Sequence, residues 1–222
     1  MKKWNLLETA TTPDGQELKL FEHDGDYSIR IRGIELMSTR QKASEEKLAE
    51  LGCAGLREKK GARVLIGGLG FGFTLRAVLS RVAYDAKVVV AELMPAVVAW
   101  NRNATYPLAA GALRDPRVEV RVGDVGELIE NVSDGFDCIL LDVDNGPSAL
   151  TLESNHKLYE LAGLKLLHKA LRADGCACIW SVDDSSSFSE LLRRSGFQVQ
   201  TVQARAHATS GGFRTIFVGR KG

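Results

Sequence analysis

The chain has 222 residues, of which 45% are hydrophobic and 26% charged, the composition of a globular protein with an ordinary core. Its 29 basic and 28 acidic residues give a formal net charge of +1, so charge provides no reason to expect nucleic acid or an anionic membrane as a partner. No run approaches the ~18 apolar residues of a membrane span, and no apolar stretch typical of a signal peptide follows the first residues. We expect a cytoplasmic protein.

Residues 1–55 are predicted to form a β-hairpin extension with a linking helix. Alternating apolar and polar residues flank the pair Asp24-Gly25, and this arrangement is a strong hairpin signal. A helical pattern follows and ends at Gly52, a residue type favoured just after a helix. The expected elements are strands at 17–22, 27–32 and 33–37 and a helix at 44–51.

Residues 56–222 alternate strands with helices, which is typical of a parallel α/β sheet. The expected strands are at 63–67, 87–92, 117–122, 136–142 and 176–181. The expected helices are at 72–82, 95–104, 124–131, 155–172 and 185–195. Two final strands, at 197–202 and 213–218, have a connection too short for a crossover helix, so we predict that they are antiparallel. The fold class is therefore a Rossmann-like, doubly wound, mostly parallel sheet of seven strands.

A glycine-rich turn follows the first strand of this second region. Gly68, Gly70 and Gly72 have the spacing G-x-G-x-G, and Phe73 stands where a dinucleotide-binding turn has its third glycine. Such a turn lets backbone N–H groups approach a ligand at a helix start. The spacing is typical of class I S-adenosylmethionine-dependent transferases, and a purely structural turn is the alternative.

Acidic residues follow successive predicted strands, at the sheet edge where open α/β proteins bind ligands. Glu92 is expected to accept hydrogen bonds from ribose hydroxyls and Asp124 from an adenine amino group. Asp142 and Asp144 follow the fourth strand. For any one of these residues, a solvated loop position or a helix cap is the alternative, and Asp124 is well placed to cap the helix behind it.

The four cysteines are interpreted as small buried apolar side chains, since no C-x-x-C motif or partnering histidine spacing accompanies them. They are Cys53, Cys138, Cys176 and Cys178. We therefore expect no metal.

Together these motifs resemble the spermidine synthases (polyamine aminopropyltransferases), within the class I methyltransferase fold. The resemblance covers residues 60–182 well and 16–60 more loosely. The segments that carry it are 64–72, like V-L-x-I-G-G-G-D-G; 90–93, like v-E-I-D; 115–124, like D-P-R-v…D; 136–142, like y-D-v-I-i-x-D; and 158–175, like f-Y…L-k-p-G-G.

The resemblance implies a cofactor, S-adenosylmethionine or its decarboxylated form, and a small amine acceptor, with a homodimer as the expected assembly. Asp142 would orient and deprotonate the attacking amine, because an ammonium is not a nucleophile. Asp144 and Asn145 would bind the acceptor. The implied cofactor-binding residues are Gly68, Gly70, Gly72, Glu92, Leu93, Asp124 and Val125.

The chain departs from the family pattern at several positions. Phe71 stands where the family has an Asp that contacts the aminopropyl amine, and Asn145 replaces the second Asp of D-S-x-D-P. The Y-H-E segment of the family has no counterpart around residues 38–46. Aminopropyl transfer is the first expectation. The alternatives are methyl transfer to a small molecule and a non-catalytic nucleoside-binding homologue.

Overall fold

The computed structural model describes residues 3–143, 157–206 and 212–222. The chain divides into two compact units, Met1–Lys42 and Ala43–Gly222. The N-terminal unit is an antiparallel sheet in the order β1-β2-β3-β4. Its strands are β1 (Asn5–Thr11), β2 (Glu17–His23), β3 (Asp26–Ile31) and β4 (Ile34–Ser38).

The predicted hairpin is confirmed by the pairing of β2 with β3, in which His23 lies opposite Asp26. Asp24 and Gly25 both have positive φ, 49° and 86°, as the tight turns of hairpins require. Strand β1 was not predicted. Its register on β2 shifts between Leu6 and Glu8, and this irregularity breaks the alternation by which strands are recognised in sequence.

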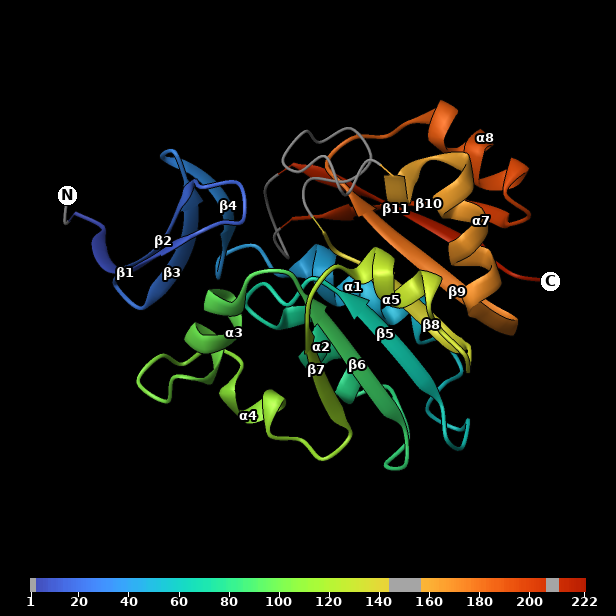
Figure 1. The fold of residues 1–222 in the computed structure, drawn as a ribbon, viewed down its shortest axis with the longest axis horizontal. Helices are drawn as coiled ribbons and strands as arrows, with labels where there is room; N and C mark the ends of the chain where they lie inside the picture. The colour runs from blue at the N-terminus through green and yellow to red at the C-terminus, as the bar shows by residue number, and fades with distance from the viewer. Residues whose placement is uncertain (1–2, 144–156, 207–211) are drawn as a thin grey trace. The chain divides into compact units, whose positions relative to one another are not determined.

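The larger unit contains a seven-stranded sheet in the order β10-β11-β9-β8-β5-β6-β7 (Figure 1). Its strands are β5 (Arg63–Gly67), β6 (Lys87–Glu92), β7 (Val118–Val122), β8 (Phe136–Leu141), β9 (Leu171–Ser181), β10 (Gln198–Arg205) and β11 (Phe213–Arg220). Strands β5 to β9 pair in parallel, whereas β11 is antiparallel to both β9 and β10. The predicted fold class is therefore confirmed.

Helices cover both faces of this sheet. They are α1 (Ala43–Gly52), α2 (Phe73–Leu79), α3 (Pro95–Arg102), α4 (Ala110–Leu113), α5 (Val125–Glu130), α7 (Leu161–Ala170) and α8 (Ser186–Arg194). Helix α1 packs against α2 and strands β8 to β11, whereas α7 contacts α5 and α8. The sequence predicts a domain boundary near residue 55, whereas the compact units divide after Lys42, because α1 packs on the larger sheet. The short helix α4 was not predicted.

Most observed elements begin and end close to the predicted positions, and the largest difference is at β9. This strand begins at Leu171 rather than near residue 176. Its pairing with β8 jumps from Phe136↔Leu171 to Cys138↔Cys176, so the intervening residues bulge out of the ladder. The predicted helix at 155–172 ends earlier for this reason, and its first two residues lie outside the described residues.

The four cysteines are buried free thiols, as predicted. They lie on β8, on β9 and at the end of α1. A Cβ atom built on Gly52 would lie 2.8 Å from the sulfur of Cys138 and 3.3 Å from that of Cys178, so the thiols fill the space where α1 crosses the sheet. Within the described ranges, no helix combines the length and apolar character needed to cross a membrane.

Candidate active site

The glycine turn connects β5 to α2 at the carboxyl edge of the parallel strands. Gly68, Gly70 and Gly72 all have positive φ, at 89°, 51° and 73°. The N–H of Gly68 donates to the carbonyl of Ala91 at 2.8 Å, and the N–H of Gly72 donates to that of Leu69, also at 2.8 Å. The turn is thus tied both to itself and to the neighbouring strand β6.

Gly68 lies very close to the end of β8. A Cβ atom at Gly68 would stand 2.3 Å from the backbone oxygen of Asp142, a distance that real Cβ atoms do not show. On the other side, the N–H of Asp142 donates to the carbonyl of Gly67 at 2.9 Å. The absence of a side chain at Gly68 therefore brings Asp142 directly beside the turn.

The Glu92 side chain, at the end of β6, is 8% exposed. Its Oε2 accepts a hydrogen bond from the N–H of Leu69 in the turn, and its Oε1 accepts one from the N–H of Met94 before α3, both at 2.8 Å. A carboxylate has about four acceptor positions. Glu92 therefore holds the turn in shape, and its role as an acceptor for ligand hydroxyls stays a prediction.

Asp124 lies at the end of β7 and caps α5. Its Oδ1 accepts a hydrogen bond from the N–H of Gly126 at 2.7 Å, so the structural alternative considered for this residue is realised. The cap uses one carboxylate oxygen and holds the side chain at the same sheet edge as Glu92. The N–H of Gly123 donates to the carbonyl of Glu92 at 3.0 Å and links the two strand ends. Leu93 and Val125 directly follow the two acids in sequence.

Asp142 is partly buried where β8 ends. The Oγ1 of Thr74, in the first turn of α2, donates to its Oδ2 at 3.2 Å. Burial raises the pKa of the Asp142 carboxyl to about 6, and the Thr74 hydrogen bond opposes this rise by favouring the ionised form. A carboxylate with this pKa is ionised at neutral pH and remains basic enough to accept a proton.

Glu45, on the first turn of α1, faces the same place. Burial raises the pKa of its carboxyl well above the ordinary value, and the charge of Asp142 raises it further, while Arg76 has the opposite effect. Its Oε2 is buried and has no hydrogen-bond partner among the described residues. The site therefore contains two carboxyl groups, from α1 and β8, that influence each other electrostatically.

Sequence reasoning missed three residues that shape this site: Glu45, Thr74 and Asn101. The fully buried Asn101 side chain donates to the carbonyls of Gly70 and Val97, both at 2.8 Å, and accepts from the N–H of Ala109 at 3.2 Å. A signal for Asn101 exists in the sequence, because it is a polar residue four positions after Val97 on an otherwise apolar helix face. Glu45 offers no such signal.

Phe71, which stands where the family pattern has an Asp, is a core residue in the structure. The Phe71 side chain is 2% exposed and belongs to the core. Its backbone carbonyl accepts a hydrogen bond from Nη1 of Arg76 at 3.2 Å, and the same nitrogen donates to the carbonyl of Leu108 at 3.3 Å. At this position the turn therefore presents a backbone and no charged side chain.

Two predicted substrate-binding residues, Asp144 and Asn145, lie outside the described residues. Trp180, on β9, is half-buried, and its indole Nε1 is buried without a hydrogen-bond partner among the residues described. Between residues 3 and 222, leaving aside 144–156 and 207–211, no group of three or more His, Cys, Asp or Glu side chains is arranged to hold a metal ion.

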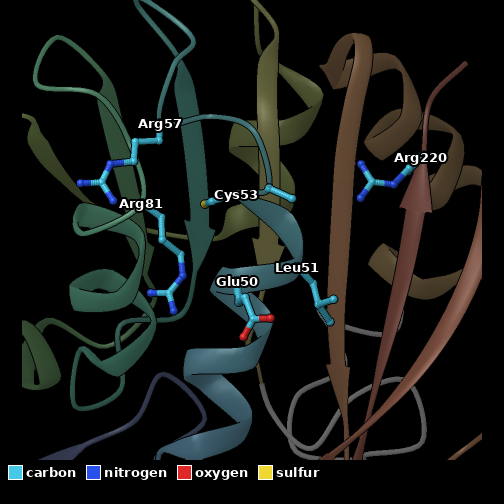
Figure 2. Close-up of a pocket in the computed structure, with 7 residues that line it drawn as sticks. Glu50, Leu51, Cys53, Arg57, Arg81 and Arg220 are labelled. Carbon is cyan, nitrogen blue, oxygen red and sulfur yellow. The ribbon is translucent and has the colours of Figure 1, made fainter.

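A cavity of about 410 Å³ lies at the opposite, amino edge of the sheet (Figure 2). Arg81 follows the end of α2, and Arg220 pairs with Cys176 near the amino end of the parallel part of β9, so the cavity is remote from the glycine turn. Open α/β sheets bind their ligands at the other edge. The lining residues are Glu50, Leu51, Cys53, Ala54, Arg57, Arg81 and Arg220.

Comparison with known families agrees with this geometry. Residues 42–195 match the model of the spermine/spermidine synthase domain. The chain belongs to the spermine/spermidine synthase family. This confirms the predicted family, and the matched segment begins at the boundary between the two compact units.

Curated members of the family share local identity with this chain. A polyamine aminopropyltransferase of Thermococcus onnurineus is 32% identical over 142 residues, which are 63% of this chain and 48% of that protein. One from Oceanobacillus iheyensis is 28% identical over 164 residues, or 72% of this chain and 30% of that protein. The aligned region thus spans about half or less of the length of these relatives.

Solved structures of the spermine/spermidine synthase family share the fold. Spermidine synthase from Thermotoga maritima superposes with a TM-score of 0.76 at 19% identity, covering 98% of this chain and 73% of that one. A spermidine synthase in complex with the transition-state analogue AdoDATO gives 0.74 at 20% identity, with the same coverage. At these identities the similarity establishes the fold.

The close approach at Gly68 predicts that Gly68→Ala destabilises the protein. A residue with a Cβ is strained at the positive φ of this position, and its Cβ would also clash with the backbone oxygen of Asp142. Together these effects should lower the free energy of unfolding by about 2–5 kcal/mol. Gly55→Ala is the matched control, because Gly55 has φ of 82° and nothing within 4 Å of its Cβ position. Urea unfolding of both variants measures the difference, and equal losses would contradict the close approach.

Proposed function

We propose that this protein is an aminopropyltransferase that uses decarboxylated S-adenosylmethionine to alkylate a small amine. The proposal rests on the glycine turn with Glu92 on one side and Asp142 on the other, at the carboxyl edge of the sheet. Membership of the spermine/spermidine synthase family supports it. When bound, the donor supplies a carbon activated by an adjacent sulfonium leaving group.

The residues present fit this ligand. Glu92 would accept from the ribose hydroxyls, and Asp124 would accept from the adenine amino group with the carboxylate oxygen that does not cap α5. The small residues Gly68, Gly70 and Gly72 leave room for the tail to pass the turn. Leu93 and Val125 would complete the nucleoside site beside the two acids.

Asp142 would act on the acceptor. An amine in water at neutral pH is mostly an ammonium, which has no lone pair for attack, so the site must attract the cation and then remove a proton. The ionised Asp142 carboxylate provides both, and the hydroxyl of Thr74 holds one of its oxygens. Asp144 and Asn145 would bind the rest of the acceptor. Because the leaving group is already activated, positioning and proton removal would supply most of the catalysis.

The acidic character of the site favours the decarboxylated donor over S-adenosylmethionine itself. Asp142, which is ionised at neutral pH, would repel the α-carboxylate of the methyl donor, whereas the decarboxylated donor carries an ammonium in its tail and lacks this carboxylate. This electrostatic argument places methyl transfer second.

The nucleoside site predicts a ligand-dependent rise in melting temperature. Methylthioadenosine and decarboxylated S-adenosylmethionine at 100 times their Kd should raise Tm by about 5–10 °C. Glu92→Ala should abolish both shifts, because it removes the ribose acceptor. It also lowers the ligand-free Tm, because two backbone N–H groups lose their partner.

The control for this experiment is Glu119→Ala, which changes an exposed acid on the adjacent strand β7. It should leave both ligand shifts intact. A larger shift with S-adenosylmethionine than with its decarboxylated form would favour methyl transfer, and no shift with any of the three ligands would refute both enzymatic functions.

The base role of Asp142 predicts the pH dependence of turnover. Asp142 must be ionised to accept a proton and its pKa is about 6, so the rate should rise as the pH increases through 6. Asp142→Asn should lower kcat about 100-fold or more and remove this limb of the profile. Asp184→Asn, at an exposed acid beyond β9, is the control and should match the wild type in initial-rate assays from pH 5 to 9.

We further propose a cytoplasmic homodimer. The cysteines are free thiols, which suits a reducing compartment. Strands β1 and β4 are the edges of the N-terminal sheet, and Leu6 and Ile34 on them are 53% and 68% exposed. Sedimentation equilibrium should give twice the monomer mass at micromolar concentration, and a monomer at all concentrations would contradict the dimer.

A further inference from the structure

Glu45 is a half-buried acid for which the fold, over the described residues, gives no use. It lies in the first turn of α1, which packs against α2, and the first turn of α2 holds Thr74 against Asp142. Its Oε2 is shielded from solvent and accepts no hydrogen bond from any of the described residues. A buried carboxyl oxygen without a donor costs free energy, so its retention calls for an explanation.

The charges around Glu45 do not neutralise it. Asp142 and Glu46 are negative and oppose its ionisation. Arg76 is the cation that favours it, but the Nη1 of this guanidinium donates to the carbonyls of Phe71 and Leu108. Two carboxyl groups from α1 and β8 thus share one partly engaged cation. A positively charged group with N–H donors would satisfy the unpaired oxygen and reduce the repulsion.

We propose that Glu45 binds a primary ammonium group of the substrate, with Asp142 as the second carboxylate of the same subsite. This assignment rests on the proposed function and deepens it. The ammonium is either that of the donor's aminopropyl tail or one belonging to the acceptor amine. Both are compact cations with three N–H donors, and carboxylate oxygens of Glu45 and Asp142 can accept hydrogen bonds from them.

The burial of Phe71 supports this assignment independently. At this position the glycine turn presents no charge, so recognition of a cation must come from another element. Helix α1 supplies Glu45 next to Asp142, where the turn and β8 meet. A carboxylate supplied by α1 can take the place of one on the turn, since binding depends on where the charge lies and not on which segment carries it.

The test compares Glu45→Gln with Glu46→Gln. Both remove one negative charge from adjacent positions of α1, but Glu46 is exposed. Isothermal titration calorimetry gives the Kd of each variant for decarboxylated S-adenosylmethionine and for methylthioadenosine. Because methylthioadenosine lacks the ammonium, the comparison isolates the contribution of the aminopropyl tail to binding. If the ammonium is the donor's, Glu45→Gln raises the Kd of the decarboxylated donor at least tenfold and changes that of methylthioadenosine less than twofold.

If the ammonium is the acceptor's, Glu45→Gln leaves both Kd values unchanged and raises the KM for putrescine, used as the probe diamine, at least tenfold. In either case Glu46→Gln behaves as the wild type. The ligand-free Tm of Glu45→Gln should equal or exceed that of the wild type, because the variant relieves the repulsion from Asp142. A purely structural role for Glu45 would instead lower this Tm or prevent folding.

Two results would overturn the assignment. A Glu45→Gln variant with a lower ligand-free Tm, or with Kd and KM values all within twofold of the wild type, refutes the role of Glu45 and leaves the proposed function intact. A wild-type protein that binds neither methylthioadenosine nor the decarboxylated donor refutes the proposed function, and the assignment of Glu45 then fails with it.

Discussion

The carboxylate of Glu92 is the interaction on which the arrangement at the sheet edge depends. It joins the end of β6, the glycine turn after β5 and the residues before α3 through two backbone hydrogen bonds of 2.8 Å. A turn of positive-φ glycines loses more backbone entropy on folding than other residues would, so it needs such external donors and acceptors to keep one shape. Asn101 provides a second anchor through the carbonyl of Gly70.

The two halves of the site use their acids differently. Glu92 and Asp124 each accept backbone N–H groups, so these carboxylates are partly satisfied by the fold before any ligand binds. Asp142 accepts one hydroxyl, and Glu45 has a buried oxygen without a donor. The first pair is held in place by these bonds, which suits its proposed role of accepting neutral hydroxyl and amino groups. The second pair combines an ionised carboxylate at Asp142 with an unsatisfied carboxyl oxygen at Glu45, an environment that a cation with N–H donors would stabilise.

The strand–turn–helix at Gly68 could be predicted from the sequence, because its signals are local. The acids at the strand ends could also be predicted, because the carboxyl ends of parallel strands meet at one edge of the sheet. The sequence was insufficient for Glu45. That residue reaches the site through the packing of α1 against α2, and a Glu in a helical first turn ordinarily lies in solvent. Strand β1 was missed because a bulge after Leu6 interrupts its alternation.

The position of β11 has a consequence for synthesis of the chain. This strand is inserted between β9 and β10, so residues 215–220 pair on both sides, and Ile216 and Phe217 are fully buried. During translation β9 therefore remains an open sheet edge until residues 213–220 have left the ribosome. The half of the site that is proposed to bind a nucleoside, built on β5, β6 and β7, can assemble earlier, but the sheet that supports β8 and Asp142 closes only when β11 is added.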